Sequence, residues 1–281
     1  MSSQNNIIAF QGQHGAYSEA ACNSSFPKME TLPCDTFEDV FDAVMEGNAQ
    51  LAMIPIENSQ AGRVADIHNL LANSALNIVG EHFQRVRHQL LGISGTTLGE
   101  IRTVSSHAQA VSQCRNFINN KNLQPILVGD TAGAAAEIAK NKDPSASAIA
   151  SKLAADIYKL KVLSQDIEDS ENNVTRFVIL SKNAIDPDPK KKVITSCIFK
   201  VRNIPAALYK ALGGFATNRV NLLKLESYMI EGNFTSTQFY LDIAGHPSDD
   251  KVRLALEELG FFTREVKILG VYLADNKRKM D

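Results

Sequence analysis

Thr175 and Arg176 place an alcohol beside a guanidinium at the point where an apolar segment begins. The apolar run Val-Ile-Leu at 178–180 predicts a buried strand. Because open α/β sheets bind ligands outside their strand ends, a polar pair there is expected to face a crevice. The arginine could hold a carboxylate through two parallel hydrogen bonds, and the hydroxyl could donate to the same ligand. From spacing alone, a solvated surface pair is the more frequent alternative.

A glycine turn after the apolar run at 7–10 is a second segment that could bind a ligand. It ends in Gly15, Ala16, Tyr17 and Ser18, where a helix is expected to start. Backbone amides at such a turn can hold an anion. The dinucleotide fingerprint G-x-G-x-x-G is absent from this turn, so the sequence predicts no nucleotide cofactor here.

A third polar segment follows the apolar run at 51–56 and comprises Glu57, Asn58, Ser59 and Gly62. Asn58 and Ser59 could donate to a substrate oxygen, or they could close an Asx-type turn on their own backbone. Glu57 could act as a general acid if burial raised its pKa, and it could equally pair with Arg63. The sequence leaves both alternatives open.

Ser106 and His107 form a fourth polar segment, directly before a predicted helix. They invite comparison with a hydrolase triad, but no G-x-S-x-G elbow is present, so helix capping is the favoured role. The six histidines lack the spacing of metal ligands, and the four cysteines lack C-x-x-C pairing. The sequence therefore predicts neither a metal site nor a disulfide framework, and the thiols are expected to be reduced.

The composition is that of a globular protein with two or three compact units. The chain has 281 residues, of which 44% are hydrophobic and 21% are charged, with a net charge of −2. No basic stripe is present, so nucleic-acid binding is not expected. The N-terminus lacks a basic region followed by an apolar one, and no apolar run approaches a membrane span. We therefore expect a cytoplasmic protein without membrane contact.

Strand-like and helix-like segments alternate through residues 1–182, which predicts mostly parallel sheets covered on both faces. Two extended crossings, at 76–93 and 160–175, divide this region into lobe 1 (about 1–80 and 165–182) and lobe 2 (about 81–164), with a cleft between them. The predicted strands cover residues 7–10, 51–56, 103–105, 126–128 and 146–149. The predicted helices include one behind the capping box of Thr36 and Asp39, one over 108–118, and one over 131–140 behind Asp130.

A proline- and charge-rich linker at 183–192 separates a second region, 193–273, from the first, and residues 274–281 form a tail. The pattern in this region predicts strand, helix, strand, strand, helix, strand, which is a ferredoxin-like βαββαβ unit. The expected elements are a strand at 193–201, a helix at 205–217, a hairpin of 220–230 and 234–244 across 231–233, a helix from Ser248 to Gly260, and a strand at 263–273.

Four motifs together resemble those of the prephenate dehydratase family, in that family's order: 12–18, 55–59, 106–110 and 173–177. The second region resembles the ACT regulatory domain that follows in that family. The resemblance implies a two-lobed, periplasmic-binding-protein-like catalytic region that converts prephenate to phenylpyruvate, carbon dioxide and water. No cofactor is implied, since the electrons released by decarboxylation enter the substrate's own ring and expel its hydroxyl.

The resemblance also implies roles for individual residues. Thr175 would contact the departing hydroxyl, as a hydrogen-bond donor rather than a true acid, which leaves the proton source open. Arg176 would bind a substrate carboxylate. The substrate would be positioned by Asn58, Ser59, Gly62, Asn173, Phe177 and the glycine-turn residues Gly15, Ala16, Tyr17 and Ser18, with Glu57, Ser106 and His107 as further site candidates.

In the ACT-like region, the family's Gly-Ala-Leu-Val is replaced by Ala206, Ala207, Leu208 and Tyr209, while Glu226 and Ser227 match its Glu-Ser-Arg-Pro. By resemblance, L-phenylalanine would bind as a feedback effector at the interface of a homodimer or homotetramer, in contact with Ala206, Ala207, Leu208, Glu226 and Ser227. Two other functions stay open from the sequence. One is arogenate dehydratase, whose substrate carries an amine in place of the ketone, and the other is a non-catalytic cytoplasmic amino-acid sensor.

Overall fold

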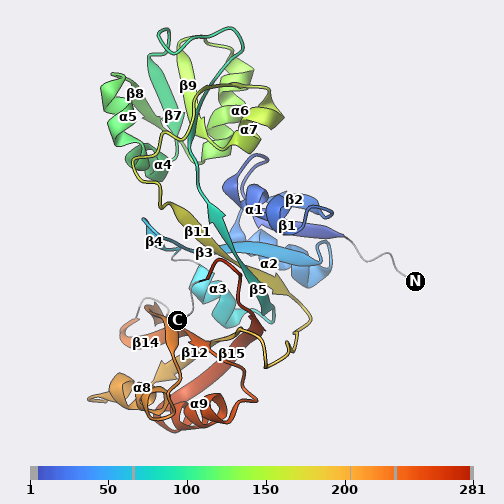
Figure 1. Ribbon diagram of the computed structural model, residues 1–281, viewed down its shortest axis with the longest axis vertical. Coiled ribbons are helices and arrows are strands. Elements are labelled where there is room, and N and C mark those ends of the chain that lie inside the picture. The colour runs from blue at the N-terminus through green and yellow to red at the C-terminus, as the bar shows by residue number, and fades with distance from the viewer. Residues whose placement is uncertain (1–5, 65–66, 203, 231–232, 279–281) are drawn as a thin grey trace. The chain divides into compact units, whose positions relative to one another are not determined.

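The computed structural model describes residues 6–64, 67–202, 204–230 and 233–278. The fold is mixed α/β with three sheets. Contacts divide the chain into a first unit, Met1–Arg63 with Phe83–Phe177, and a second unit, Val64–His82 with Val178–Asp281. Figure 1 shows the elements of each unit.

The first sheet has the order β2-β1-β3-β11-β5, with β4 paired to β3. Its strands are β1 (Ile7–Gln11), β2 (Glu30–Cys34), β3 (Leu51–Asn58), β4 (Gly62–Arg63), β5 (Asn77–Arg85) and β11 (Val174–Ser181). Helices α1 (Tyr17–Ser25) and α2 (Phe37–Glu46) follow β1 and β2, and β1 is parallel to both β2 and β3. The predicted capping box of Thr36 and Asp39 is confirmed at the start of α2.

The second sheet has the order β10-β6-β9-β7-β8 and is covered on both faces, as predicted. Its strands are β6 (Gln89–Gly92), β7 (Thr103–Ser106), β8 (Gln124–Leu127), β9 (Ala146–Ala150) and β10 (Lys161–Ser164). Because side chains alternate along a strand, Leu90 and Ile149 pack with helices α4 (Ala108–Gln113) and α5 (Arg115–Asn120). Leu91 and Ala148 pack with α6 (Thr131–Asn141) and α7 (Lys152–Tyr158).

Two expectations for this region are corrected. The sheets are mixed, since β6 runs antiparallel to both β9 and β10. The segments expected to be extended crossings carry strands of both sheets, β5 and β6 in one and β10 in the other. The helix predicted over 108–118 breaks at Cys114, whose backbone leaves the helical region with φ −117° and ψ 23°. Local apolar spacing carries no signal for such a break.

The C-terminal sheet of the second unit is antiparallel with the order β13-β14-β12-β15. Its elements are β12 (Val193–Val201), α8 (Ala207–Thr217), β13 (Leu222–Ile230), β14 (Asn233–Ala244), α9 (Asp250–Phe262) and β15 (Thr263–Leu273), which is the predicted βαββαβ order. Figure 1 shows α8 and α9 beside this sheet. Phe199, Phe215, Phe239 and Leu259 belong to the core that joins the sheet and these helices. Residues 231 and 232 of the predicted hairpin turn lie outside the described residues.

Both helix starts in this domain differ from the prediction. Helix α8 begins at Ala207, two residues late, because Ala206 adopts the left-handed conformation with φ 61°. Helix α9 has Asp249 rather than Ser248 at its N-cap, and it ends at Phe262 rather than Gly260.

Within the second unit, helix α3 (Ile67–Asn73) and β5 are fastened to β15 and the residues after it. Lys267 donates from Nζ to the carbonyl oxygens of Ala72 (2.8 Å) and Ser74 (2.6 Å). The buried Glu81 carboxylate accepts two hydrogen bonds of 2.7 Å from the Arg278 guanidinium. These charge-assisted bonds hold the segment before the second sheet against the C-terminal sheet.

Gly270 allows β15 to approach β5 closely, because a Cβ at this position would overlap the carbonyl oxygen of Ile78. We expect Gly270→Ala to lower the free energy of unfolding by about 1–3 kcal/mol through overpacking. Urea denaturation measures this change. Gly260→Ala is the matched control, since a Cβ there meets nothing within 4 Å and α9 should gain about 0.5–1 kcal/mol. Equal effects of the two substitutions would contradict the close approach.

Candidate functional site

The Asn58 amide connects the end of β3 to the start of β11. Its Oδ1 accepts hydrogen bonds from the backbone N–H groups of Gln60 (3.0 Å) and Ala61 (2.9 Å). Its Nδ2 donates to Thr175 Oγ1 (3.0 Å) and to Asn173 Oδ1 (2.8 Å). Asn58 therefore closes an Asx-type turn and serves as a donor at the same time. The Asx-type turn expected from the sequence is thus observed, whereas donation to a substrate oxygen stays a prediction.

Thr175 is fixed as a hydrogen-bond donor by this arrangement. A hydroxyl has one hydrogen and two lone pairs, and Asn58 Nδ2 uses a lone pair of Thr175 Oγ1. The side chain is half-buried, and its hydroxyl hydrogen stays available for a ligand oxygen.

A series of hydrogen-bonded side chains, called the polar chain below, runs from Asn58 through Asn173 to Gln113 and His88. The sequence did not single out Gln113 or His88. Asn173 is fully buried and donates from Nδ2 to Gln113 Oε1 (2.8 Å). Gln113 Oε1 lies 2.9 Å from Nε2 of His88, and His88 Nδ1 lies 2.8 Å from the Tyr17 hydroxyl. Burial lowers the pKa of His88, against the opposing effect of its bond to Gln113, and burial raises the pKa of Tyr17. A neutral imidazole and a neutral phenol are therefore favoured.

Arg176 lies inside the first unit and pairs with Glu57. Its Nη1 is 3.0 Å from Glu57 Oε1, and the two side chains are 2% and 32% exposed. Glu57 faces Arg63 across the β3–β4 pairing, and it forms an ion pair with Arg176. The sequence raised pairing with Arg63 and did not indicate the pairing with Arg176. Direct contact of Arg176 with a substrate carboxylate stays a prediction.

Ser59, Gly62 and Phe177 lie beside these residues and serve the local fold. The Ser59 hydroxyl donates to the Asn172 carbonyl (2.6 Å) and accepts from the Val174 N–H (3.0 Å), which joins the loop after β3 to the start of β11. Gly62 opposes Asn58 across the β3–β4 pairing with φ 79°. Phe177 is buried, as its expected packing role requires.

A carboxylate of the protein itself occupies the glycine turn after β1. The buried Glu19 accepts hydrogen bonds from the Gly15 N–H (2.6 Å) and the Thr31 hydroxyl (2.8 Å), and it lies 2.8 Å from His14 Nδ1. The sequence predicted that backbone amides of this turn bind an anion. They do bind one, but it is a side chain four residues further along α1.

The same turn packs against the start of α7. Ser151 donates from Oγ to the Gly15 carbonyl (2.6 Å), and a Cβ on Gly15, which has φ 94°, would overlap Ala154. Ala16 is the N-cap of α1, and Ser18 lies in its first turn. The turn thus connects the two sheet regions of the first unit, and substrate contacts by Gly15, Ala16 and Ser18 stay predictions.

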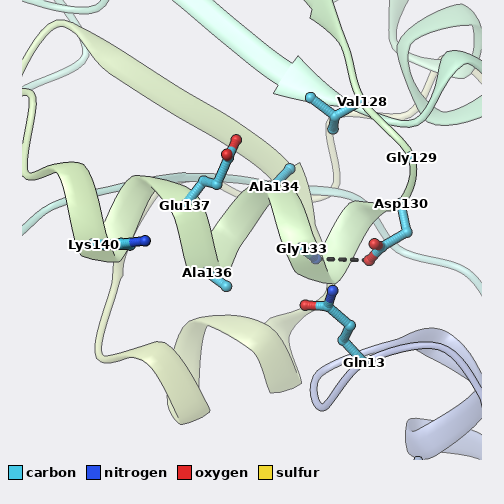
Figure 2. A pocket seen from close by; sticks show the side chains of 9 residues that line it. All are labelled: Gln13, Val128, Gly129, Asp130, Gly133, Ala134, Ala136, Glu137 and Lys140. Atoms are coloured by element: carbon cyan, nitrogen blue, oxygen red, sulfur yellow. Dashed lines mark hydrogen bonds between the residues drawn. The ribbon is translucent and has the colours of Figure 1, made fainter. Parts of the chain in front are cut away.

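A pocket of about 500 Å³ opens beside this turn, at the start of α6. Figure 2 shows the Gln13 amide opposite Gly133, whose N–H donates to the capping Asp130 carboxylate (2.6 Å). The lining residues are Gln13, Val128, Gly129, Asp130, Gly133, Ala134, Ala136, Glu137 and Lys140. Two carboxylates, Asp130 and Glu137, and one ammonium, Lys140, line this pocket. It therefore disfavours an anionic ligand more than the neutral groups around Asn58 do.

Ser106 and His107 lie outside the polar chain. Ser106 is fully buried and donates to the Ile149 carbonyl (2.6 Å), which ties β7 to β9. His107 is exposed and caps α4 by accepting from the Gln109 N–H (3.3 Å). The favoured capping role is thus seen for His107.

A Ser-His-Asp array occurs in the second unit, before α9. His246 lies 2.7 Å from the Ser248 hydroxyl through Nδ1 and 2.8 Å from Asp186 through Nε2. The same Nδ1 also accepts the Ser248 N–H (3.0 Å), and Asp186 is 89% exposed. Asp249 and Asp250 follow directly, and their negative charge opposes an oxyanion. We interpret the array as a loop structure rather than a nucleophilic site.

Thiol and metal chemistry find little support in the described part of the chain. Burial raises the pKa of Cys22 and Cys114 far above the ordinary value, and it raises the pKa of Cys197 to about 12. A thiol that stays protonated is a poor nucleophile. Among the described residues, no group of three or more His, Cys, Asp or Glu side chains is arranged to hold a metal ion.

Comparisons with known proteins place the chain. A family model described as prephenate dehydratase matches residues 8–185. The bifunctional N-acyl-homoserine lactone acylase/prephenate dehydratase of Komagataeibacter europaeus is 49% identical over 97% of this chain and 98% of its own length. Arogenate dehydratase/prephenate dehydratase 2 of Arabidopsis thaliana is 37% identical over 95% of this chain and 73% of its own length. The structure of Arthrobacter aurescens prephenate dehydratase with L-Phe is 28% identical, with a TM-score of 0.90 and coverage of 98% and 92%.

The fold and the matched region define an enzyme of the carbon–oxygen lyase class, a decarboxylating dehydratase. The chain belongs to the prephenate dehydratase family, because the family model spans more than half of it and the Komagataeibacter relative matches it nearly end to end. In the described residues, no helix is long and apolar enough to cross a membrane.

Replacing the Asn58 amide by a carboxylate tests the direction of its hydrogen bonds. Asn58→Asp keeps an oxygen for the backbone N–H groups of Gln60 and Ala61, but it sets a second oxygen against Asn173 Oδ1. We expect the free energy of unfolding to fall by about 1–3 kcal/mol, measured by urea denaturation. Asn119→Asp, on exposed α5, makes the same chemical change and should stay within about 0.5 kcal/mol of the parent. Indistinguishable values for the two variants would show that Asn58 is not held as described.

Proposed function

We propose that this protein converts prephenate to phenylpyruvate, carbon dioxide and water, with Thr175 donating a hydrogen bond to the departing hydroxyl. The observation that supports this role is the bond from Asn58 Nδ2 to Thr175 Oγ1, which turns the hydroxyl hydrogen away from Asn58. A leaving hydroxyl gathers negative charge as its bond to carbon breaks, so a fixed donor stabilises the transition state more than the ground state.

The reaction asks mainly for orientation from the protein. Decarboxylation releases an electron pair into the diene ring of prephenate, the pair expels the hydroxyl, and the ring becomes aromatic. A protein that holds the substrate with its hydroxyl near Thr175 and its carboxylate oriented for loss of carbon dioxide lowers the activation barrier, because the reactive geometry is already formed on binding. Arg176 contributes positive charge behind this site and holds Glu57 in place.

Prephenate rather than arogenate is the proposed substrate. The Komagataeibacter relative, at 49% identity, is named as a prephenate dehydratase, whereas the plant relative at 37% carries both names. The two substrates differ at the side chain, where a ketone accepts hydrogen bonds and an ammonium only donates them. The acylase activity in the name of the Komagataeibacter relative is not proposed for this chain, because the Ser248 array lacks the features of a nucleophilic site.

We also infer that the C-terminal βαββαβ domain is an ACT-type regulatory domain that binds L-phenylalanine. The Arthrobacter relative was solved with L-Phe, and the similarity covers 98% of this chain. Of the residues expected to contact the effector, Ala206 adopts φ 61°, a conformation in which the family's glycine has no strain. Ser227 is exposed on β13, and the carboxylate of Glu226 lies 3.6 Å from Lys224 Nζ.

Assembly into a homodimer or homotetramer is part of this proposal. The C-terminal domain exposes large apolar side chains, including Tyr209 (81%) and Phe261 (73%). Exposed aromatic residues on a small domain are frequent in protein interfaces.

Turnover of prephenate by Thr175 variants tests the proposed reaction. Thr175→Ala is expected to fold normally and to lose about 10²-fold or more in phenylpyruvate formation, since it removes the donor to the leaving group. Thr175→Ser keeps a hydroxyl and should retain most of the parent rate. Phenylpyruvate absorbance measures both.

The outcome with arogenate completes this test. A parent enzyme that forms phenylalanine from arogenate with a higher kcat/KM than it shows for prephenate would reassign the substrate. A parent without turnover of either compound would favour the amino-acid sensor, and a Thr175→Ala variant as active as the parent would remove Thr175 from the mechanism.

Isothermal titration with L-phenylalanine tests the regulatory role. We expect saturable binding together with inhibition of prephenate turnover, because an effector shifts activity only by its differential affinity for two states. Ala206→Gly should bind L-phenylalanine at least as tightly, since it relieves the left-handed strain at this position. The absence of heat at millimolar effector, with unchanged activity, would leave the domain an assembly role only.

A further inference from the structure

We infer that His88 is a positioning residue for the dehydration site: it fixes the Gln113 amide so that Gln113 presents N–H donors, and not its carbonyl oxygen, to an acceptor oxygen of the substrate. This inference rests on the proposed function. Neither His88 nor Gln113 is among the residues that the sequence motifs indicated.

The direction of every bond in the polar chain follows from two backbone amides. The N–H groups of Gln60 and Ala61 can only donate, so the atom of Asn58 that faces them is its oxygen. The other atom of Asn58 is therefore the nitrogen, and it requires an oxygen from Asn173. The nitrogen of Asn173 in turn requires an oxygen from Gln113.

His88 closes the chain at its other end. Because Gln113 Oε1 accepts, the ring atom that faces it at 2.9 Å, Nε2, carries the hydrogen. In the neutral imidazole, Nδ1 is then bare and lies 2.8 Å from the Tyr17 hydroxyl. The same hydroxyl lies 2.9 Å from the Arg87 carbonyl oxygen, so its one hydrogen is shared between that oxygen and Nδ1. Burial of the ring, which is 2% exposed, favours this neutral form. The orientation of Gln113 thus follows from the Asn58 end of the chain, and the neutral His88 with its hydrogen on Nε2 matches that orientation.

Gln113 Nε2 is the atom of this amide that can bind a ligand. Two donors, from His88 and Asn173, converge on Gln113 Oε1, so the amide cannot turn over without placing its NH₂ group against both of them. Gln113 is half-buried, and no hydrogen bond of its Nε2 to another described residue is found. Its N–H groups stay available, and Gln113 belongs to the same hydrogen-bonded chain as Thr175, through Asn173 and Asn58. A carboxylate or ketone oxygen is the group that such donors recognise.

Amide substitutions at His88 separate positioning from packing. His88→Gln can place its Nε2 where the imidazole Nε2 lies, and so donate to Gln113, whereas the amide of His88→Asn is too short and reaches only the position of Nδ1. We expect His88→Asn to lower kcat/KM for prephenate by about 10-fold to 100-fold, as misplaced substrate contacts do. His88→Gln should stay within about threefold of the parent. Both variants should keep a cooperative unfolding transition.

A double-mutant cycle shows whether His88 acts through Gln113. Gln113→Ala alone should lower kcat/KM, and adding His88→Asn to it should lower kcat/KM by less than about twofold more. His246→Asn is the matched control. It removes an equally buried imidazole that is hydrogen-bonded through both nitrogens in the second unit, and it should leave uninhibited turnover unchanged.

Two results would overturn the inference. Equal losses in His88→Asn and His88→Gln would assign His88 to packing, and fully additive losses in the cycle would uncouple it from Gln113. A parent without prephenate turnover would instead overturn the proposed function. An active parent whose His88→Asn variant is equally active would overturn only the role of His88.

Discussion

Two backbone N–H groups, those of Gln60 and Ala61, fix the polarity of the whole candidate site. They hold the Asn58 oxygen, and the Asn58 nitrogen then sets Thr175 as a donor and Asn173 as an acceptor. A backbone amide cannot reverse its hydrogen bond, whereas side-chain amides and hydroxyls can. The loop after β3 supplies two N–H groups that can only donate. The hydrogen bonds among the neutral side chains around Asn58 therefore all run in one direction.

Buried polar groups also have to be satisfied, and this requirement explains much of the arrangement around the site. Asn173 is fully buried and uses both ends of its amide, and the nearly buried Arg176 is paired with Glu57. Removing one partner in either place would leave a buried polar group unpaired, which destabilises a fold by about 1–5 kcal/mol. The contacts that stabilise the fold are thus the same contacts that orient the donors, which is how a site becomes preorganised before any ligand binds.

Local patterns in the sequence were sufficient for much of the fold. The capping box placed the start of α2, and apolar alternation placed β12 and β15, because these signals depend on neighbouring residues alone. The break at Cys114 and the strand pairing of β5 and β6 were not predictable in this way. Both depend on which segments meet in space, and local spacing likewise did not indicate the left-handed conformation of Ala206.

The sequence by itself determined the family resemblance and the importance of Asn58, Thr175 and Arg176, because motif residues keep their type and order along the chain. Only the tertiary structure decided what each group faces. It paired Arg176 with Glu57, placed Glu19 at the glycine turn, and brought together His88, from the segment before β6, and Gln113, from α4. Hydrogen-bond direction is a property of pairs of atoms, and the bond between Asn58 and Thr175 joins residues separated by 117 positions.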